Sequence, residues 1–154
     1  MAKKFAIIAS KGTLDGGYPP FIFASTAAAL GYDVKIFFTF YGLQLLRKDL
    51  NPKVSPLGNP AMPMPIPVPS LIQIIPGLEW FATWMMKRKL KQKGVASIEE
   101  LRDICIESGV ELIACQMTVD LFDFQETDFI DGISSGGAAT FLEFSSEADT
   151  TLYI

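Results

Sequence analysis

Cys115 is the residue best placed for chemistry in this sequence. It ends the mostly apolar run Val110–Ala114, which reads as a buried strand, and directly precedes a segment with the pattern of a helix. At the carboxyl edge of a parallel sheet, such a residue lies where α/β proteins commonly place their sites. The first helical amides, from Gln116, Met117 and Thr118, and the helix dipole would favour the nucleophilic thiolate. From the residues alone two interpretations stay open: a buried core cysteine, and a reactive thiol in a partly exposed crevice.

Several other kinds of chemistry are excluded because the chain contains no histidine. Serine–histidine–aspartate catalysis, cysteine–histidine protease chemistry and histidine-ligated metal sites all require that residue. Two cysteines cannot complete a four-cysteine zinc site within one chain, and the aspartates between 120 and 131 fit no oxygen-ligand loop. We therefore predict no metal and no cofactor, which leaves thiol chemistry, carboxylate chemistry or simple binding.

The second cysteine, Cys105, falls within a predicted helix that begins at Ser97 and stops at Gly109. Ser97 and Glu100 have the spacing of a capping box, and the apolar residues that follow recur at helical spacing. This pattern places Cys105 on or beside the buried face, as a structural residue. A second, resolving thiol is the alternative, because this helix precedes the strand that bears Cys115, although nothing obliges the two sulfurs to meet.

Strands and helices alternate along the chain, which is typical of an α/β fold with a mostly parallel sheet. The predicted strands are 4–10, 34–38, 110–115, 129–133 (a short strand or bend) and 150–154. The predicted helices are 18–30, about 43–50, 78–93, 97–109, 116–122 and 138–146. We expect a single three-layer domain over residues 1–154, with a proline-rich and helical insertion at about 51–94.

The segment 10–17 follows the first predicted strand and precedes a helix, where a phosphate-binding loop would lie. It matches neither the three-glycine dinucleotide spacing nor the lysine–serine/threonine ending of a nucleotide-binding loop. We interpret its glycines as serving a tight turn. Gly12, Thr13, Gly16 and Gly17 could nevertheless face the same sheet edge as Cys115.

Most of the prolines lie between Asn51 and Pro76, where their density excludes a helix or an interior strand and favours an extended excursion. The helix predicted after it has an aromatic first half, a cationic second half and four candidate contact residues, Trp80, Phe81, Trp84 and Met85. We expect this surface to pack on a partner subunit; contact with a membrane surface is the alternative. A transmembrane span is not predicted, because no proline-free apolar stretch of about 20 residues exists.

The overall composition narrows the partners and the compartment. Asp and Glu outnumber Lys and Arg by 17 to 13, so the charge gives no reason to expect nucleic acid. The low cysteine content and the absence of a secretory leader predict a cytoplasmic protein, with peripheral membrane contact left open. The extent of apolar sequence in the insertion argues for a homo-oligomer.

Three separated segments, 58–65, 93–101 and 113–118, carry a resemblance to a known family. With nearly the whole chain, they resemble the DsrE/DsrF/DsrH-like family of sulfur-trafficking proteins, especially the branch with a methionine- and proline-rich insertion. The resemblance implies a compact α/β fold and a trimer, tetramer or hexamer. It also implies partners such as a TusA-like sulfur carrier and a rhodanese.

The reactive cysteine of that family follows a strand and begins a helix, and Cys115 is the matching position. The resemblance implies that Cys115 carries sulfane sulfur, as a persulfide or a thiosulfonate, and passes it to an acceptor thiol. The Thr118 hydroxyl could add a hydrogen bond to this sulfur. The alternative is a non-catalytic assembly or membrane-adaptor subunit that uses the apolar arm 61–86. A thiol peroxidase or disulfide reductase is less favoured, because the chain has no Cys-x-x-Cys pair.

Overall fold

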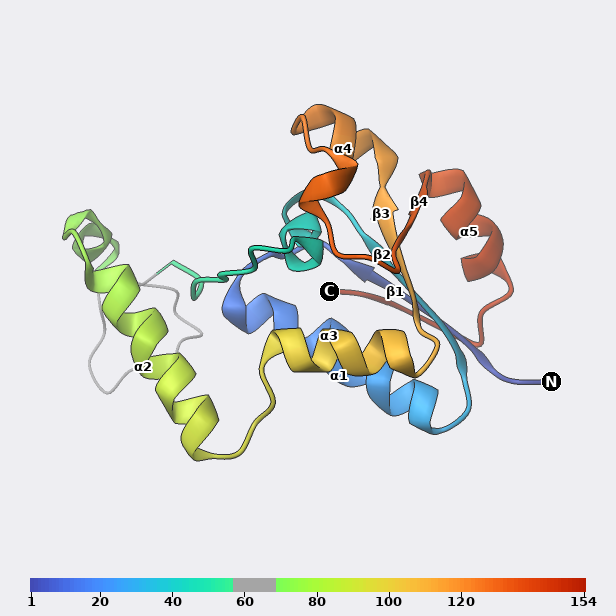
Figure 1. The fold of residues 1–154 in the computed structure, drawn as a ribbon, viewed down its shortest axis with the longest axis horizontal. Helices are drawn as coiled ribbons and strands as arrows, with labels where there is room; N and C mark the ends of the chain where they lie inside the picture. Colours follow the sequence, from blue (N-terminus) through green and yellow to red (C-terminus); the bar gives the residue numbers. More distant parts are fainter. Residues whose placement is uncertain (57–68) are drawn as a thin grey trace.

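The computed structural model describes residues 1–56 and 69–154, which form a five-stranded parallel sheet covered by helices (Figure 1). The strands are β1 (Lys4–Ala9), β2 (Asp33–Phe38), β3 (Glu111–Cys115), β4 (Ser134–Gly136) and β5 (Thr150–Tyr153). Their order is β4-β3-β2-β1-β5, and every neighbouring pair is parallel. All five carboxyl ends therefore share one edge of the sheet, as the alternating sequence pattern predicts.

Helices cover the two faces of the sheet unequally. Helices α1 (Leu14–Ala29) and α3 (Ile98–Glu107) pack on one face, α5 (Ala138–Ser146) on the other, and α4 (Gln116–Leu121) lies beyond the carboxyl end of β3. Alternate residues of each strand point to opposite faces, so Ile7 joins the larger core cluster under α1 and α3, and Ala6 the smaller one under α5. The three-layer prediction is confirmed.

The start of α1 differs from the prediction. The helix begins at Leu14, four residues earlier than expected, because the Thr13 side chain caps it by accepting the Gly16 N–H at 3.1 Å. Pro19 and Pro20 consequently lie inside the helix instead of near its start.

The helix predicted at about 43–50 is also wrong in extent and type. The structure has a 3₁₀ helix, η1 (Phe40–Leu46), and the chain then leaves helical geometry. Arg47 is extended and forms an antiparallel bridge with Phe129, and the Lys48 N–H, in the turn that follows, donates to the Asp128 carbonyl at 3.0 Å.

The segment expected to form a strand or bend at 129–133 contributes only that single bridge at Phe129. The strand that pairs with β3 on the side away from β2 is instead β4, three residues with little apolar character. A single turn of 3₁₀ helix, η3 (Glu126–Asp128), precedes the bridge.

The described part of the insertion extends away from the sheet (Figure 1). It comprises residues 51–56, a 3₁₀ helix η2 (Ser70–Ile74) and helix α2 (Leu78–Gln92), and α2 matches its predicted span closely. Predictions for 57–68 lie outside the described residues, but η2 shows that the excursion up to Pro76 is not extended throughout. Among the described helices, none has both the length and the apolar character needed to cross a bilayer.

Candidate functional site

Cys115 ends β3 at the carboxyl edge of the sheet and is the N-cap residue of α4, as predicted. It belongs to the smaller core cluster, together with Ile113 and Phe141, on the face covered by α5. Phe141, from the first half of α5, stacks on Phe37 of β2 with ring centroids 5.0 Å apart. Because this packing encloses the cluster, Cys115 is only 4% exposed. The expectation of a partly exposed crevice is therefore wrong for this conformation.

Thr118 is fully buried, and its hydroxyl is committed to the turn that follows β2. The hydroxyl accepts the Phe40 N–H at 3.1 Å and lies 3.4 Å from the Thr39 hydroxyl. Phe40 has a positive φ of 47°, a conformation that residues other than glycine rarely adopt. Thr118 thus holds a strained turn against α4. Of the other two predicted residues, Gln116 donates its side-chain amide to Asp120 at 2.8 Å, and Met117 is exposed.

Cys105 lies in the larger core cluster, on the opposite face of the sheet from the cluster that contains Cys115. Its thiol is fully buried and donates to the Phe21 carbonyl at 3.6 Å. Burial raises the pKa of this thiol to about 12, so it stays protonated at neutral pH. The structural interpretation is supported, and the fold does not bring the two sulfurs together.

The loop 10–17 reaches the carboxyl edge, but the amides at the start of α1 are already bonded within the chain. The Leu14 N–H donates to the Lys53 carbonyl at 2.7 Å, and the Gly17 N–H to the Thr13 carbonyl at 2.8 Å. Gly12 packs so closely on η1 that a Cβ there would lie 2.2 Å from the Tyr41 carbonyl oxygen. These contacts favour the tight-turn interpretation over phosphate binding.

At this edge, the described residues line two clefts to which Cys115 does not contribute. One, of about 570 Å³, lies beside the ends of β1 and β5 and includes Lys11 and Asp15. The other, of about 440 Å³, lies between the Gly12–Thr13 turn and the segment 47–56 that follows η1. Among the described residues, no group of histidine, cysteine and carboxylate side chains is arranged to hold a metal ion.

A sequence model of the DsrE/DsrF/DrsH-like family matches residues 1–153. The chain belongs to this family. It is 62% identical to the sulfur carrier protein DsrE2 of Allochromatium vinosum over 156 residues, which cover 99% of this chain and 98% of the relative. It is 31% identical to the uncharacterized protein YrkE of Bacillus subtilis, over 99% and 97% of the two chains.

Solved structures support the fold of this family member. The crystal structure of the ychN protein from E. coli aligns with a TM-score of 0.59 at 15% identity and covers 99% of both chains. The structure of protein BT1422 from Bacteroides thetaiotaomicron aligns with a TM-score of 0.58 at 13% identity, over 99% of this chain and 95% of its own. At these identities the likeness concerns the fold alone.

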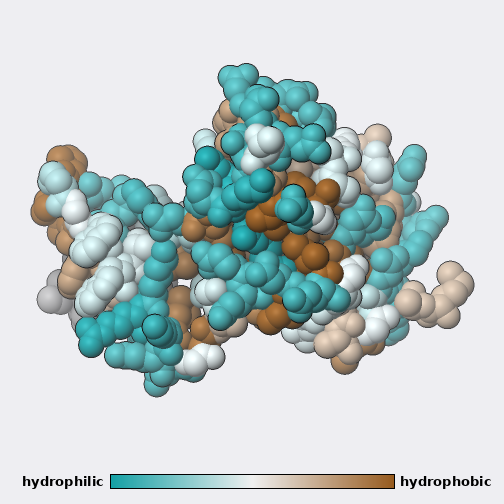
Figure 2. Space-filling model, in the orientation of Figure 1, coloured by the Kyte–Doolittle hydropathy of each residue, from teal (hydrophilic) through white to brown (hydrophobic). Residues whose placement is uncertain are grey.

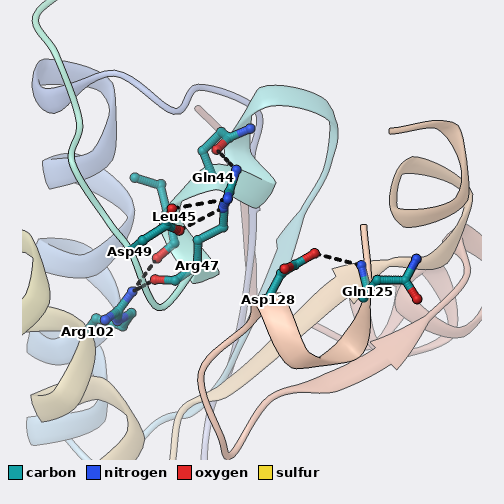
Figure 3. Close-up of polar contacts among 7 residues, drawn as sticks. All are labelled: Gln44, Leu45, Arg47, Asp49, Arg102, Gln125 and Asp128. Carbon is teal, nitrogen blue, oxygen red and sulfur yellow. Dashed lines mark hydrogen bonds and ion pairs between the residues drawn. The ribbon is translucent and has the colours of Figure 1, made fainter. Parts of the chain in front are cut away.

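In this DsrE/DsrF/DrsH-like chain, a buried arginine that the sequence analysis missed joins α3 to the end of η1 (Figure 3). Arg102 donates from Nη1 to the carbonyls of Leu45 at 2.9 Å and Arg47 at 3.0 Å. Burial lowers the pKa of its guanidinium, and its Nε has no hydrogen-bond partner among the described residues. The signal was an arginine at a core-facing position of the predicted helix, four residues after Ile98.

The predicted contact surface of the insertion is exposed. Trp80, Phe81, Trp84 and Met85 all reach solvent, and Trp80 does so with 68% of its area. The rings of Phe81 and Trp84 stack at 6.0 Å, and the Arg88 guanidinium lies 5.4 Å from the Trp84 ring centre. In Figure 2 the lobe of η2 and α2 is hydrophobic at its upper end and hydrophilic at its lower end. This surface lies apart from Cys115.

Proposed function

We propose that this protein is a sulfur carrier that holds sulfane sulfur on Cys115 and passes it to an acceptor thiol. The observation that carries the proposal is the position of Cys115 at the carboxyl edge of β3, where α4 begins. The other cysteine is fully buried on the opposite face and stays protonated. The family, and the 62% identity to a protein named as a sulfur carrier, support the same chemistry.

The transfer consists of two thiol–disulfide-type exchanges. In the first, the Cys115 thiolate attacks the outer sulfur of a donor persulfide, the donor S–S bond breaks, and the donor leaves as a thiolate. Cys115 then carries the outer sulfur and its proton as a persulfide. In the second, an acceptor thiolate attacks that outer sulfur and Cys115 leaves as a thiolate. With a thiosulfonate donor, the Cys115 thiolate attacks the divalent sulfane sulfur bonded to the donor, the donor S–S bond breaks, and the –S–SO3⁻ group moves to Cys115 while the donor leaves as a thiolate.

In this proposal, the residues at the start of α4 stabilise and position the Cys115 sulfur. The backbone amides of Gln116 and Met117 come first in α4 and are the nearest donors along the chain for negative charge on the sulfur. Thr118 has a positioning role, because its hydroxyl accepts the Phe40 N–H and so fixes α4 against the turn at Phe40. Since Cys115 is almost closed off, the first turns of α4 or α5 must move outward before a donor reaches the sulfur.

Intact-protein mass spectrometry after incubation with polysulfide, and separately with tetrathionate, tests this proposal. We expect reducible sulfur adducts on the wild type and on Cys105→Ser, and none on Cys115→Ser. Adducts that persist in Cys115→Ser, or that disappear only in Cys105→Ser, would refute it. Circular dichroism of each variant checks that the fold is retained.

The proposal extends to partners and assembly. A TusA-like sulfur carrier and a rhodanese are the donor or acceptor classes that the family resemblance suggests, and a homo-oligomer of three, four or six chains would cover apolar surface that is exposed here. Light scattering gives the number of subunits. Mixing the loaded protein with a reduced TusA-like carrier tests whether the sulfur mass moves to the carrier.

A second function, membrane adaptor, is favoured by the exposed face of α2. Its aromatic residues adjoin a cationic stretch, 87–93, a combination typical of helices that lie at the surface of an anionic bilayer. Flotation with phosphatidylserine-containing liposomes tests this function. An adaptor should float whether or not Cys115 is present, and should fail to float when Trp80 and Trp84 are both replaced by Ser.

A further inference from the structure

An exposed apolar patch surrounds α4, next to Cys115. Five side chains form it, and we call them the α4 patch: Phe40, Tyr41, Met117, Leu121 and Phe122. Phe122 stacks on Tyr41 at 6.1 Å and meets Phe40 edge-on at 6.3 Å, which joins α4 to the start of η1. Apolar side chains gathered in this way at a protein surface commonly mark a contact with another protein.

The backbone geometry maintains this exposure. Phe40 adopts a left-handed conformation, which is unfavourable for a residue with a side chain as large as phenylalanine. The buried Thr118 hydroxyl accepts its N–H and so stabilises this turn from the interior of α4. Phe40 is nevertheless 43% exposed, so its strained backbone does not serve to bury the ring. Strain of this kind concentrates at functional positions.

The rim of the patch is acidic. Asp120 on α4, Asp123 directly after it and Glu126 at the start of η3 are all exposed. Every Lys and Arg of the chain lies at or before Arg102, so this whole segment contains no cation of its own. Two cations from the end of η1 lie beside the segment. Arg47 is paired with Asp49 and covers the Phe124 ring at 5.4 Å, whereas Lys48 is exposed.

We propose that the α4 patch and its acidic rim dock a basic partner protein that exchanges sulfur with Cys115. This inference rests on the proposed carrier function. The partner presents an apolar centre and a ring of Lys and Arg around its own persulfide. On docking, the Cys115 thiolate attacks the outer sulfur of that persulfide, the partner's S–S bond breaks, and the partner leaves as a thiolate. Reversal of the same step delivers the sulfur.

The charges favour a basic protein over the other occupants. An anionic bilayer and a nucleic acid would both meet three exposed carboxylates, and like charges in close contact are unfavourable. A second copy of this chain could offer the cationic stretch of its own α2. That occupant predicts that disruption of the patch changes the oligomeric state.

Two synthetic peptides of equal length provide the probe. Each carries one cysteine persulfide, flanked by Arg and Lys in one peptide and by Glu in the other. We expect the basic peptide to load Cys115 about tenfold faster at low salt, because opposite charge accelerates encounter, and the advantage to shrink at high salt. In the triple variant Asp120→Asn, Asp123→Asn, Glu126→Gln, the basic peptide should lose most of its rate advantage over the acidic peptide. The control Asp103→Asn, Glu107→Gln, on exposed positions of α3, should keep it.

The outcomes separate the two proposals. Equal rates for both peptides, with polysulfide still loading Cys115, would overturn the docking surface and leave the carrier function standing. Failure of every donor to load Cys115 would overturn both. Light scattering of Met117→Asp with Leu121→Asp adds an independent readout. Loss of subunits in that variant would assign the patch to a second copy and contradict the proposal, whereas an unchanged mass with slower loading by the basic peptide supports it.

Discussion

At the scale of single residues, the fold gives its two cysteines opposite environments. Cys115 ends a strand at an edge where two helices begin nearby, and a modest opening of either helix would uncover it. Cys105 faces the packed interior between α1 and α3, and its sulfur already donates to a carbonyl. The two cysteines therefore differ in their place in the fold: Cys115 is the candidate sulfur carrier, and Cys105 is a core residue.

The raised pKa of Cys105 predicts a pH-dependent loss of stability. In the unfolded chain this thiol ionises near its ordinary value of 9.0, whereas burial holds the proton in the folded protein until the pH reaches a pKa of about 12. Between these values unfolding releases a proton, so the free energy of unfolding falls as pH rises. Cys105→Ala should lose on the order of 1 kcal/mol at pH 7 and show a shallower decline above pH 9. Urea titrations at a series of pH values measure both declines, and equal declines in the wild type and the variant would contradict the raised pKa.

The second prediction for a single residue concerns the hydrogen bond between the Phe40 N–H and the Thr118 hydroxyl. Thr118→Val keeps the shape of the side chain but leaves the Phe40 N–H without its acceptor, which should destabilise the protein by about 1–3 kcal/mol. Thr118→Ser keeps the hydroxyl and loses only a methyl group. Hydrogen exchange of the Phe40 amide distinguishes the two variants: exchange should be fast in the valine variant and slow in the serine variant. Slow exchange in both would show that another group holds this amide.

At the scale of elements, the strands and helices with a strong local pattern were predicted well. Strands β1, β2, β3 and β5 and helices α2, α3 and α5 all lie at or within a few residues of their expected positions. The capping box of α3 is present as the sequence indicated. These elements depend on hydrophobic spacing and caps, which are local properties.

The elements that were missed depend on contacts between distant parts of the chain. Strand β4 carries little apolar signal, and its existence depends on pairing with β3. The pairing of residues 47–48 with 128–129 joins segments about eighty positions apart. The burial of Cys115 requires Phe141, which the sequence does not connect to it. The position of the candidate site was therefore predictable, and its accessibility was not.

The close contact of Gly42 in η1 with the end of β1 leads to a prediction about stability. A Cβ on Gly42 of η1 would lie 2.2 Å from the Ala9 carbonyl oxygen at the end of β1. Gly42→Ala should therefore destabilise the protein by about 3 kcal/mol, because backbone atoms must shift to relieve the overlap. Gly137→Ala is the matched control, since nothing lies within 4 Å of its added Cβ, and it should change stability by less than about 1 kcal/mol. Equal thermal denaturation midpoints for the two variants would contradict this close approach.

At the scale of the whole molecule, charge and apolar surface are divided between two regions. Helix α4, with the acidic residues on and after it, lies at the end of the sheet that bears Cys115. Helix α2, which ends in the cationic stretch, lies on the insertion, away from the sheet (Figure 1). This separation allows one chain to offer a sulfur-exchange surface and a second contact surface at the same time. The two proposed functions therefore need not exclude each other.

Helix α2 should open independently of the sheet, because few buried contacts with the rest of the described chain hold it. Thr83 is its one buried residue, and it accepts the Val54 N–H at 3.2 Å. The ion pair between Lys53 and Glu79, at 3.6 Å, is exposed and adds little. We therefore expect the amides of α2 to exchange hydrogen faster than those of α1 and α3. Thr83→Val should accelerate this exchange, and Lys53→Ala should leave it nearly unchanged.

Anionic vesicles extend this experiment to function. If α2 lies on a bilayer, the vesicles should slow exchange in α2 and leave α1 and α3 as they were, because only the aromatic and cationic helix becomes shielded. Uncharged vesicles serve as the control for the cationic contribution. If, without vesicles, the amides of α2 exchange hydrogen as slowly as those of α1 and α3, the insertion opens together with the sheet as one cooperative unit. In that case α2 is a structural part of the carrier domain and not a separate contact element.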